Sequence, residues 1–165
     1  MKIAFLYAGQ GSQRVGMGRD LYDASPAFRA AFDAGHLDFD LHALCFEGAQ
    51  ETLNQTQYTQ PCMVAFACGV TAALFDAGLR PDYVAGLSLG EYSALEASGV
   101  LTAQSAIELA AYRGAAMAKA SEGIQSAMTA VLGLDREALM RCCEEAGELG
   151  VVQICNYNCP GQIII

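Results

Sequence analysis

Short apolar runs and longer segments of helical periodicity alternate along the first two thirds of the chain. Residues 2–8 and 83–86 are apolar runs of the length expected for buried strands. Helical segments are predicted around Leu21, at 28–34 and at 51–54. Such an alternation of strands and helices favours an α/β fold with a mainly parallel sheet.

Two long helices are predicted from apolar content and from the residues at their ends. The first covers 59–77, with Pro61 at an early position that tolerates proline and a glycine directly after its end. The second covers 103–119 and follows Thr102, a favourable capping residue. A shorter helix, rich in Ala, Leu and Glu, is predicted at 89–98.

The pattern changes after residue 123. A strand, a helix and two further strands are predicted at 127–134, 135–146, 151–157 and 162–165. This order resembles the opening half of a small α+β subdomain, so we predict two parts, 1–123 and 124–165. Because a natural domain rarely ends on a bare apolar strand, we also expect the chain to be incomplete.

The composition narrows the classes of protein to consider. Hydrophobic residues make up 53% and charged residues 16%, which excludes a disordered chain. Seven cysteines without a secretory signal favour a reducing compartment, so a cytoplasmic protein is expected. The longest apolar stretch, 62–75, is too short to span a bilayer, and no membrane insertion is expected. The net charge of −9, with nine thinly spread basic residues, argues against nucleic acid as a partner.

The segment 86–90 (GLSLG) is the most informative candidate for chemistry. It fits the G-x-S-x-G pattern of a nucleophile elbow, in which Ser88 occupies a sharp turn between a strand and a helix. The predicted strand before it and the helix after it provide the required context. The turn would hold the Ser88 hydroxyl near the free N–H groups of a helix N-terminus.

The glycine-rich loop 9–18 follows the first predicted strand. It lacks a glycine at Arg14 for a dinucleotide fingerprint and a lysine at Met17 for a P-loop. Its strand-end position instead favours the backbone N–H of Gln10 as one half of an oxyanion hole. The other half would be the N–H of Leu89, directly after the nucleophile. A plain strand–helix connection is the alternative for this loop.

A serine nucleophile needs a base, and the chain offers only His36 and His42. Both precede the serine, whereas elbow hydrolases place the histidine after it, so neither is a convincing base. Arg113 lies in an apolar part of a predicted helix, where an unpaired guanidinium is costly to bury. It suits a substrate carboxylate, although a structural ion pair with Glu91 or Glu108 is an equal alternative from spacing alone. The cysteines show no metal-binding spacing, and no metal site is predicted.

Several segments together resemble the malonyl-CoA:acyl carrier protein transacylase family. They are 5–13 (FLYAGQGSQ), 59–61 (TQP), 86–95 (GLSLGEYSAL), 113–114 (RG) and 156–162 (NYNCPGQ). The resemblance implies a large α/β-hydrolase-like subdomain with a parallel sheet and an inserted ferredoxin-like subdomain, of which this chain holds the opening half. It also implies transfer of a malonyl group from coenzyme A to the phosphopantetheine thiol of acyl carrier protein in fatty acid synthesis.

The resemblance also implies roles for individual residues. Ser88 would form a malonyl ester, Gln10 and Leu89 would supply oxyanion N–H groups, and Arg113 would bind the malonyl carboxylate. Malonyl-CoA would be the substrate, with no cofactor. Leu87 departs from the histidine that many members carry there, and altered packing is the expected result.

The length of the chain is the larger departure from the family. The family's catalytic histidine would lie beyond Ile165, so the 165 residues alone are expected to be inactive. An esterase- or lipase-like serine hydrolase, a polyketide synthase acyltransferase domain and a non-enzymatic binding module remain alternatives.

Overall fold

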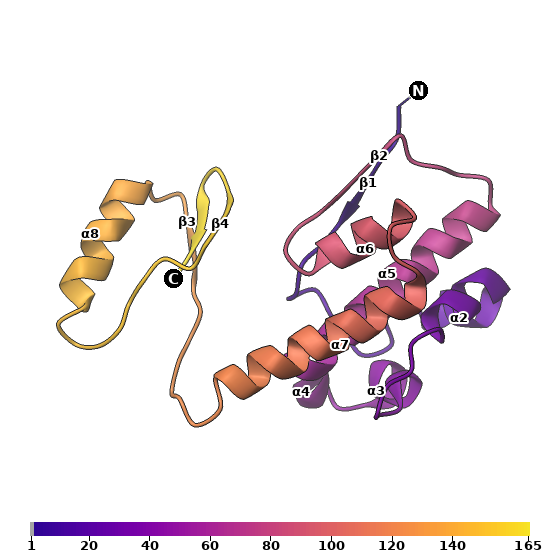
Figure 1. Cartoon of the computed structure of the whole chain (residues 1–165), viewed down its shortest axis with the longest axis horizontal. Helices are drawn as coiled ribbons and strands as arrows, with labels where there is room; N and C mark the ends of the chain where they lie inside the picture. The colour runs from indigo at the N-terminus through magenta and orange to yellow at the C-terminus, as the bar shows by residue number, and fades with distance from the viewer. Residues whose placement is uncertain (1) are drawn as a thin grey trace. The chain divides into compact units, whose positions relative to one another are not determined.

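The computed structural model describes residues 2–165, which form two compact units (Figure 1). The first unit ends at Glu122, and the second covers Gly123–Ile165. The boundary therefore lies one residue before the one expected from the sequence pattern. Every candidate site residue belongs to the first unit.

The first unit is built around a two-stranded parallel sheet. Strand β1 (Ala4–Tyr7) pairs with β2 (Tyr83–Gly86) in a register that runs from Ala4 opposite Tyr83 to Tyr7 opposite Gly86. The long connection between the two strands contains five helices, as parallel pairing requires a crossover. The carboxyl ends of both strands therefore lie side by side, and the segments that follow them, 8–18 and 87–89, begin at the same edge. The predicted α/β class with a parallel sheet is confirmed.

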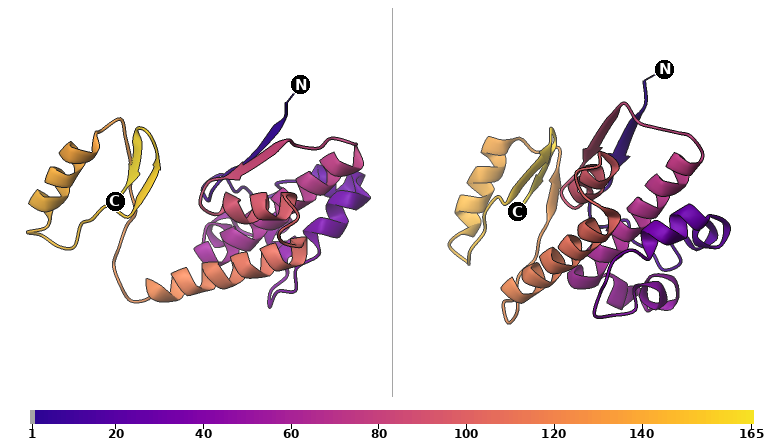
Figure 2. Two further views of the ribbon diagram at one scale, coloured as in Figure 1. Left: turned by 45° about the horizontal axis from the view of Figure 1, so that its top comes forward. Right: turned by 45° about the vertical axis from the view of Figure 1, so that its right-hand side comes forward.

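Seven helices surround this sheet and form the core of the first unit. They are α1 (Arg19–Ala24), α2 (Pro26–Phe32), α3 (Leu41–Glu47), α4 (Gln50–Leu53), α5 (Thr56–Asp76), α6 (Gly90–Ala97) and α7 (Ala103–Ala120). Helices α5 and α7 lie side by side over much of their length (Figures 1 and 2). Phe28, Phe32, Val64 and Ile107 are almost completely buried between the helices. The hydroxyl of Thr102 accepts a hydrogen bond from the N–H of Ser105, which confirms the predicted cap of α7.

Helix α5 begins earlier than the sequence pattern indicated. It starts at Thr56 rather than Thr59, so Pro61 lies inside the helix, beyond its first turn. Proline at this position removes one main-chain donor. The Thr59 hydroxyl donates to the carbonyls of Leu53 and Gln55, which fixes the chain where it enters the helix.

The length of α5 also changes the argument about membranes. By length and composition alone, this helix of 21 residues is long and apolar enough to cross a bilayer. In the structure, α5 packs against α2, α6 and α7, and it carries many of the core residues of the first unit. A core helix of a globular unit passes the same test of length and hydropathy, and the packing identifies α5 as one.

The second unit contains the predicted strand–helix–strand–strand order. Its elements are β3 (Ala130–Leu132), α8 (Arg136–Ala146), β4 (Asn156–Cys159) and β5 (Gln162–Ile164). The strands form an antiparallel sheet in the order β3-β5-β4, so β5 lies between the two strands that α8 connects. This is a split βαβ arrangement. Leu139 and Cys143 of α8 pack against Ile163 to form a small core.

The strands of the second unit are shorter than predicted. The sequence pattern indicated strands at 127–134 and 151–157, whereas β3 has three residues and β4 begins only at Asn156. Both strands pair with β5, which itself has three residues. A strand extends only as far as it has a partner for its main-chain groups, and apolar content alone does not reveal that limit.

Candidate functional site

Ser88 occupies a strained turn between β2 and α6. Its φ of 51° makes it the only non-glycine residue with positive φ among residues 2–165. This left-handed conformation is costly for a residue with a side chain, and such strain is concentrated at functional sites. The structure thus contains the strand–turn–helix context that the G-x-S-x-G pattern predicts.

The two glycines of this pattern allow close approaches of the main chain. A Cβ atom on Gly86 would collide with the backbone of Gly90 and Glu91. A Cβ atom on Gly90 would collide with the carbonyl group of Tyr7 at the end of β1. The Leu87 N–H also donates to the Tyr7 carbonyl over 3.0 Å. The turn is therefore held tightly against the end of β1.

Two main-chain donors near Ser88 have no partner within residues 2–165. Glu91 donates its N–H to the Ser88 carbonyl, but neither Leu89 nor Gln10 uses its N–H in a hydrogen bond. Leu89 itself is buried, and its side chain packs into the core of the first unit. The two N–H groups proposed for an oxyanion hole thus have no hydrogen-bond partner in this part of the chain, and their catalytic role stays a prediction.

The Arg113 guanidinium reaches the candidate nucleophile from α7. Its Nη2 lies 3.3 Å from the Ser88 Oγ, and its Nη1 donates to the Gln60 Oε1 over 2.7 Å. Glu108 accepts hydrogen bonds from Gln104 and from the main chain of His36 instead. In the described part of the chain Arg113 forms no ion pair, so the alternative of a structural pair with Glu91 or Glu108 is not realised.

Gln60 connects Arg113 to Gln10. It is completely buried, and its Nε2 lies 3.5 Å from the Gln10 Oε1 and 3.3 Å from the Met117 Sδ. The Thr56 hydroxyl donates to the same Gln10 oxygen over 2.9 Å. The sequence pattern assigned no role to Thr56 or Gln60. A buried amide on an otherwise apolar helix is the signal that could have identified Gln60.

The two histidines lie elsewhere in the first unit. The His42 ring packs edge-on against Tyr22 and Phe46, with centroids 5.0 and 4.7 Å apart. The His36 main-chain N–H donates to the Glu108 carboxylate over 3.2 Å. Neither histidine hydrogen bonds to Ser88 in residues 2–165, so this part of the chain places no histidine base on the serine.

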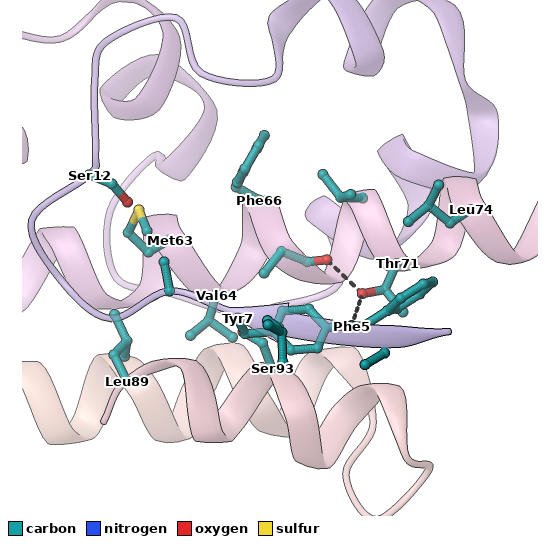
Figure 3. A pocket seen from close by; sticks show the side chains of 15 residues that line it. Phe5, Tyr7, Ser12, Met63, Val64, Phe66, Thr71, Leu74, Leu89 and Ser93 are labelled. Atoms are coloured by element: carbon teal, nitrogen blue, oxygen red, sulfur yellow. Dashed lines mark hydrogen bonds between the residues drawn. The ribbon is translucent and has the colours of Figure 1, made fainter. Parts of the chain in front are cut away.

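A cavity of about 440 Å³ lies along β1 (Figure 3). It lies between β1 and α5, and its lining is mostly apolar, including Phe5, Val64 and Phe66. The Tyr7 hydroxyl pairs with the Thr71 hydroxyl within it over 2.7 Å. Leu89 lines this cavity, but Ser88 and Arg113 do not, so the cavity is separate from these two candidate residues.

Helix α6 carries one buried carboxyl group, that of Glu96, next to Cys68 in the core of the first unit. Burial raises the pKa of Glu96 from 4.5 to about 7, and the neighbouring Cys68 thiol partly offsets the rise. The Oε2 atom of Glu96 is buried without a hydrogen-bond partner among residues 2–165. The same part of the chain contains no group of three His, Cys, Asp or Glu side chains that could hold a metal ion.

The chain is similar in sequence to known acyltransferases. Residues 4–165 match the acyl transferase domain family. The chain is 44% identical over 167 residues to the malonyl CoA-acyl carrier protein transacylase of Bacillus subtilis and 39% identical over 171 residues to that of Escherichia coli K12. These alignments cover 99% of this chain but 53% and 54% of the relatives, so the chain spans about half of their length.

Solved structures give the same result. The crystal structure of MCAT from Streptococcus pneumoniae matches with a TM-score of 0.85 at 47% identity. A malonyl-transacylase in complex with a type II PKS acyl-carrier protein matches with a TM-score of 0.87 at 38% identity. Each match covers 99% of this chain and 54% of the solved chain. The elbow at Ser88, its Arg113 neighbour and these matches together show that the chain belongs to the acyl transferase domain family.

Proposed function

We propose that the protein transfers a malonyl group from malonyl-CoA to the phosphopantetheine thiol of an acyl carrier protein. The names of its relatives support this substrate and this partner. One observation in the site carries the proposal. A guanidinium lies 3.3 Å from the candidate nucleophile and has no carboxylate partner within residues 2–165.

This arrangement favours an acyl group that brings its own negative charge. Arg113 is half-buried, and its nearest partner is the neutral amide of Gln60. A carboxylate could accept two parallel N–H bonds from the planar guanidinium, which a neutral acetyl group cannot do. Malonyl-CoA is the substrate in this account, and no cofactor is required.

The transfer needs two displacements at one carbonyl carbon. The Ser88 oxygen attacks the thioester carbonyl, the carbon–sulfur bond breaks, and coenzyme A leaves with a proton on its thiol. The carrier thiol then attacks the serine ester, and the serine oxygen recovers its proton. The N–H groups of Gln10 and Leu89 would stabilise the oxyanion formed in each step.

Both steps need a general base next to Ser88. Neither His36 nor His42 hydrogen bonds to Ser88 among residues 2–165, so we assign the base to a residue outside this range. Arg113 does not serve as the base, because a guanidinium stays protonated in proteins. Its role in this proposal is to orient the acyl group and to select for the carboxylate.

The test is malonyl transfer to holo acyl carrier protein by the complete gene product. We expect transfer with malonyl-CoA and its loss, by several orders of magnitude, in Ser88→Ala. Ser121→Ala, which changes an exposed serine at the end of α7, is the matched control and should retain the activity. Transfer that survives Ser88→Ala would refute the serine ester and, with it, the proposed mechanism.

An esterase-like hydrolase is the competing assignment, because the elbow alone fits both classes. Turnover of neutral esters at the rate of malonyl-CoA would favour it. The carrier is tested with fatty acid and type II polyketide carrier proteins in parallel, since one structural relative is complexed with the latter kind. We place the reaction in the cytoplasm, which agrees with seven free cysteines.

A further inference from the structure

We propose that Gly114 is a positioning residue for Arg113, an inference that rests on the proposed function. Gly114 follows Arg113 directly on α7 and is buried against the beginning of α5. A Cβ atom at this position would lie 2.7 Å from the Thr56 carbonyl oxygen and 3.0 Å from the Gln57 Cα. Real side chains do not approach a main-chain oxygen that closely, so only glycine permits the observed distance between the two helices.

The close approach lies at the turn of α5 that organises the candidate site. Thr56 donates its hydroxyl to Gln10, and Gln60, one turn further, accepts from the Arg113 guanidinium. The spacing of α5 and α7 at Gly114 therefore sets how far Arg113 reaches. Any side chain here would have to move α7 away from the main chain of α5, because neither Thr56 O nor Gln57 Cα can rotate aside.

The geometry leaves little room for such a movement. The distance from the Arg113 Nη2 to the Ser88 Oγ is 3.3 Å, already at the long end for a hydrogen bond. A shift of α7 away from α5 would lengthen the bond from Arg113 to Gln60 and displace the guanidinium from its present position beside Ser88. The guanidinium would then no longer lie where a malonyl carboxylate joined to Ser88 could reach it.

Intrinsic helix propensity, unlike the close approach of α5, disfavours glycine at position 114. In a helix interior, alanine is favoured over glycine by about 1 kcal/mol. The neighbours of Gly114 on α7 are alanines at 111, 115 and 116, so the helix tolerates that side chain elsewhere. The glycine thus lowers the stability of the helix, and the close approach it permits is the compensating gain.

The experiment is a double-mutant cycle in the complete gene product, with malonyl-CoA and acetyl-CoA as the acyl donors. Gly114→Ala should lower kcat/KM for malonyl loading by about 10- to 100-fold, the cost of misplacing a binding group by about 1 Å. Acetyl loading should change far less, because acetyl has no carboxylate for Arg113. In an Arg113→Ala background, Gly114→Ala should change malonyl loading by less than about twofold, since the residue through which it acts is absent.

Gly150→Ala serves as the control for adding a methyl group, because nothing lies within 4 Å of a Cβ there. It should leave both loading rates unchanged. Equal losses for malonyl and acetyl, additive effects in the cycle, or failure of Gly114→Ala to fold would each overturn the proposal, since each would make the glycine a general packing requirement. If the unmodified protein does not load malonyl at all, the proposed function itself fails, a result distinct from any outcome for Gly114.

Discussion

Arg113 and Gln60 form the polar centre of the candidate site. The guanidinium binds a completely buried amide at 2.7 Å and lies 3.3 Å from the Ser88 hydroxyl. A neutral partner orients the cation without neutralising it, which leaves its charge available for a substrate carboxylate. Gln60 also faces Gln10, so one amide contacts both the proposed acyl-binding residue, Arg113, and a residue of the predicted oxyanion hole.

Replacing this amide should weaken malonyl binding selectively. Gln60→Leu keeps the volume but removes the acceptor of a charged hydrogen bond, worth about 1.5–3 kcal/mol. We expect kcat/KM for malonyl-CoA to fall by about 10- to 100-fold and the value for acetyl-CoA to fall less. Steady-state kinetics with both donors measure this, with Gln104→Leu on an exposed part of α7 as the control. Equal losses for the two donors would contradict the role assigned to Gln60.

Glu96 should make the stability of the fold depend on pH. Its pKa is raised from 4.5 to about 7 by burial, so the folded state holds a proton that the unfolded state has released. The free energy of unfolding should therefore fall as the pH rises from about 4.5 to about 7 and level off above. Cys68 and Tyr7 are the titratable groups beside Glu96, and both have raised pKa values, so they stay neutral in this range.

The variant Glu96→Gln should remove this part of the pH dependence and be more stable than the parent above pH 7. Urea unfolding between pH 5 and pH 8 measures the effect, with Glu91→Gln, an exposed carboxylate on the same helix, as the control. A stability profile that stays parallel to the parent's in Glu96→Gln would contradict the raised pKa.

The sequence alone identifies some of the candidate site residues and not others. Ser88 stands out because glycines flank it, and Arg113 stands out because it is a cation in an apolar helix segment. His36 and His42 are unconvincing as the base because both precede the serine in the chain. Gln60 and Thr56 do not differ in this way from their sequence neighbours. They are identified only by their hydrogen bonds to Gln10 and, for Gln60, to Arg113 of α7. The side-chain partners of a residue depend on tertiary packing, which a single sequence does not contain.

The turn between β2 and α6 is the element on which the site depends. Gly90 packs so closely on the carbonyl of Tyr7 that no side chain fits between them. Gly90→Ala should therefore separate the turn from β1 and lower the free energy of unfolding by more than about 2 kcal/mol. Thermal and urea unfolding test this, again with Gly150→Ala as the control. A fully stable variant would show that the turn can relax, in contradiction to the packing described.

The elements themselves were predictable where the pattern is strong and local. The strands of the parallel sheet, the cap at Thr102 and the helix that follows it agree with the sequence pattern. The predicted start of α5 is wrong because proline favours the first turn of a helix, whereas Pro61 lies beyond it and the Thr59 hydroxyl bonds to the carbonyls of Leu53 and Gln55. The strands of the second unit were predicted too long, because their length depends on the three residues of β5.

On the scale of the molecule, the chain consists of two units, and the first contains Gln10, Ser88, Leu89 and Arg113. It holds the candidate nucleophile, the two candidate oxyanion donors and the cation, and neither histidine hydrogen bonds to Ser88 among residues 2–165. The α/β class of the first unit and the strand–helix–strand–strand order of the second were predictable from the alternation of elements and from its change after residue 123, whereas the spatial strand order β3-β5-β4 was not. The sequence also shows the serine motif with both histidines before it, at positions 36 and 42.

This leads to a prediction about the 165 residues by themselves. Without a base, the serine stays weakly nucleophilic, and loss of one triad member lowers rates by several orders of magnitude. We expect the isolated chain to show negligible malonyl transfer under conditions in which the complete gene product is active. Robust transfer by the isolated chain, abolished in His36→Ala or His42→Ala, would contradict this account.

The central claim is that Arg113 selects an acyl group with a free carboxylate for transfer to Ser88. It is tested most directly by mixing the complete gene product with equal amounts of malonyl-CoA and acetyl-CoA. Mass spectrometry of the intact protein and of its Ser88 peptide then identifies the acyl group and the residue that carries it. The account predicts that the parent carries malonyl on Ser88, whereas Arg113→Ala loses the preference for malonyl over acetyl and Arg141→Ala on α8 retains it. An unchanged malonyl preference in Arg113→Ala, or an acyl group on any residue other than Ser88, would contradict the account.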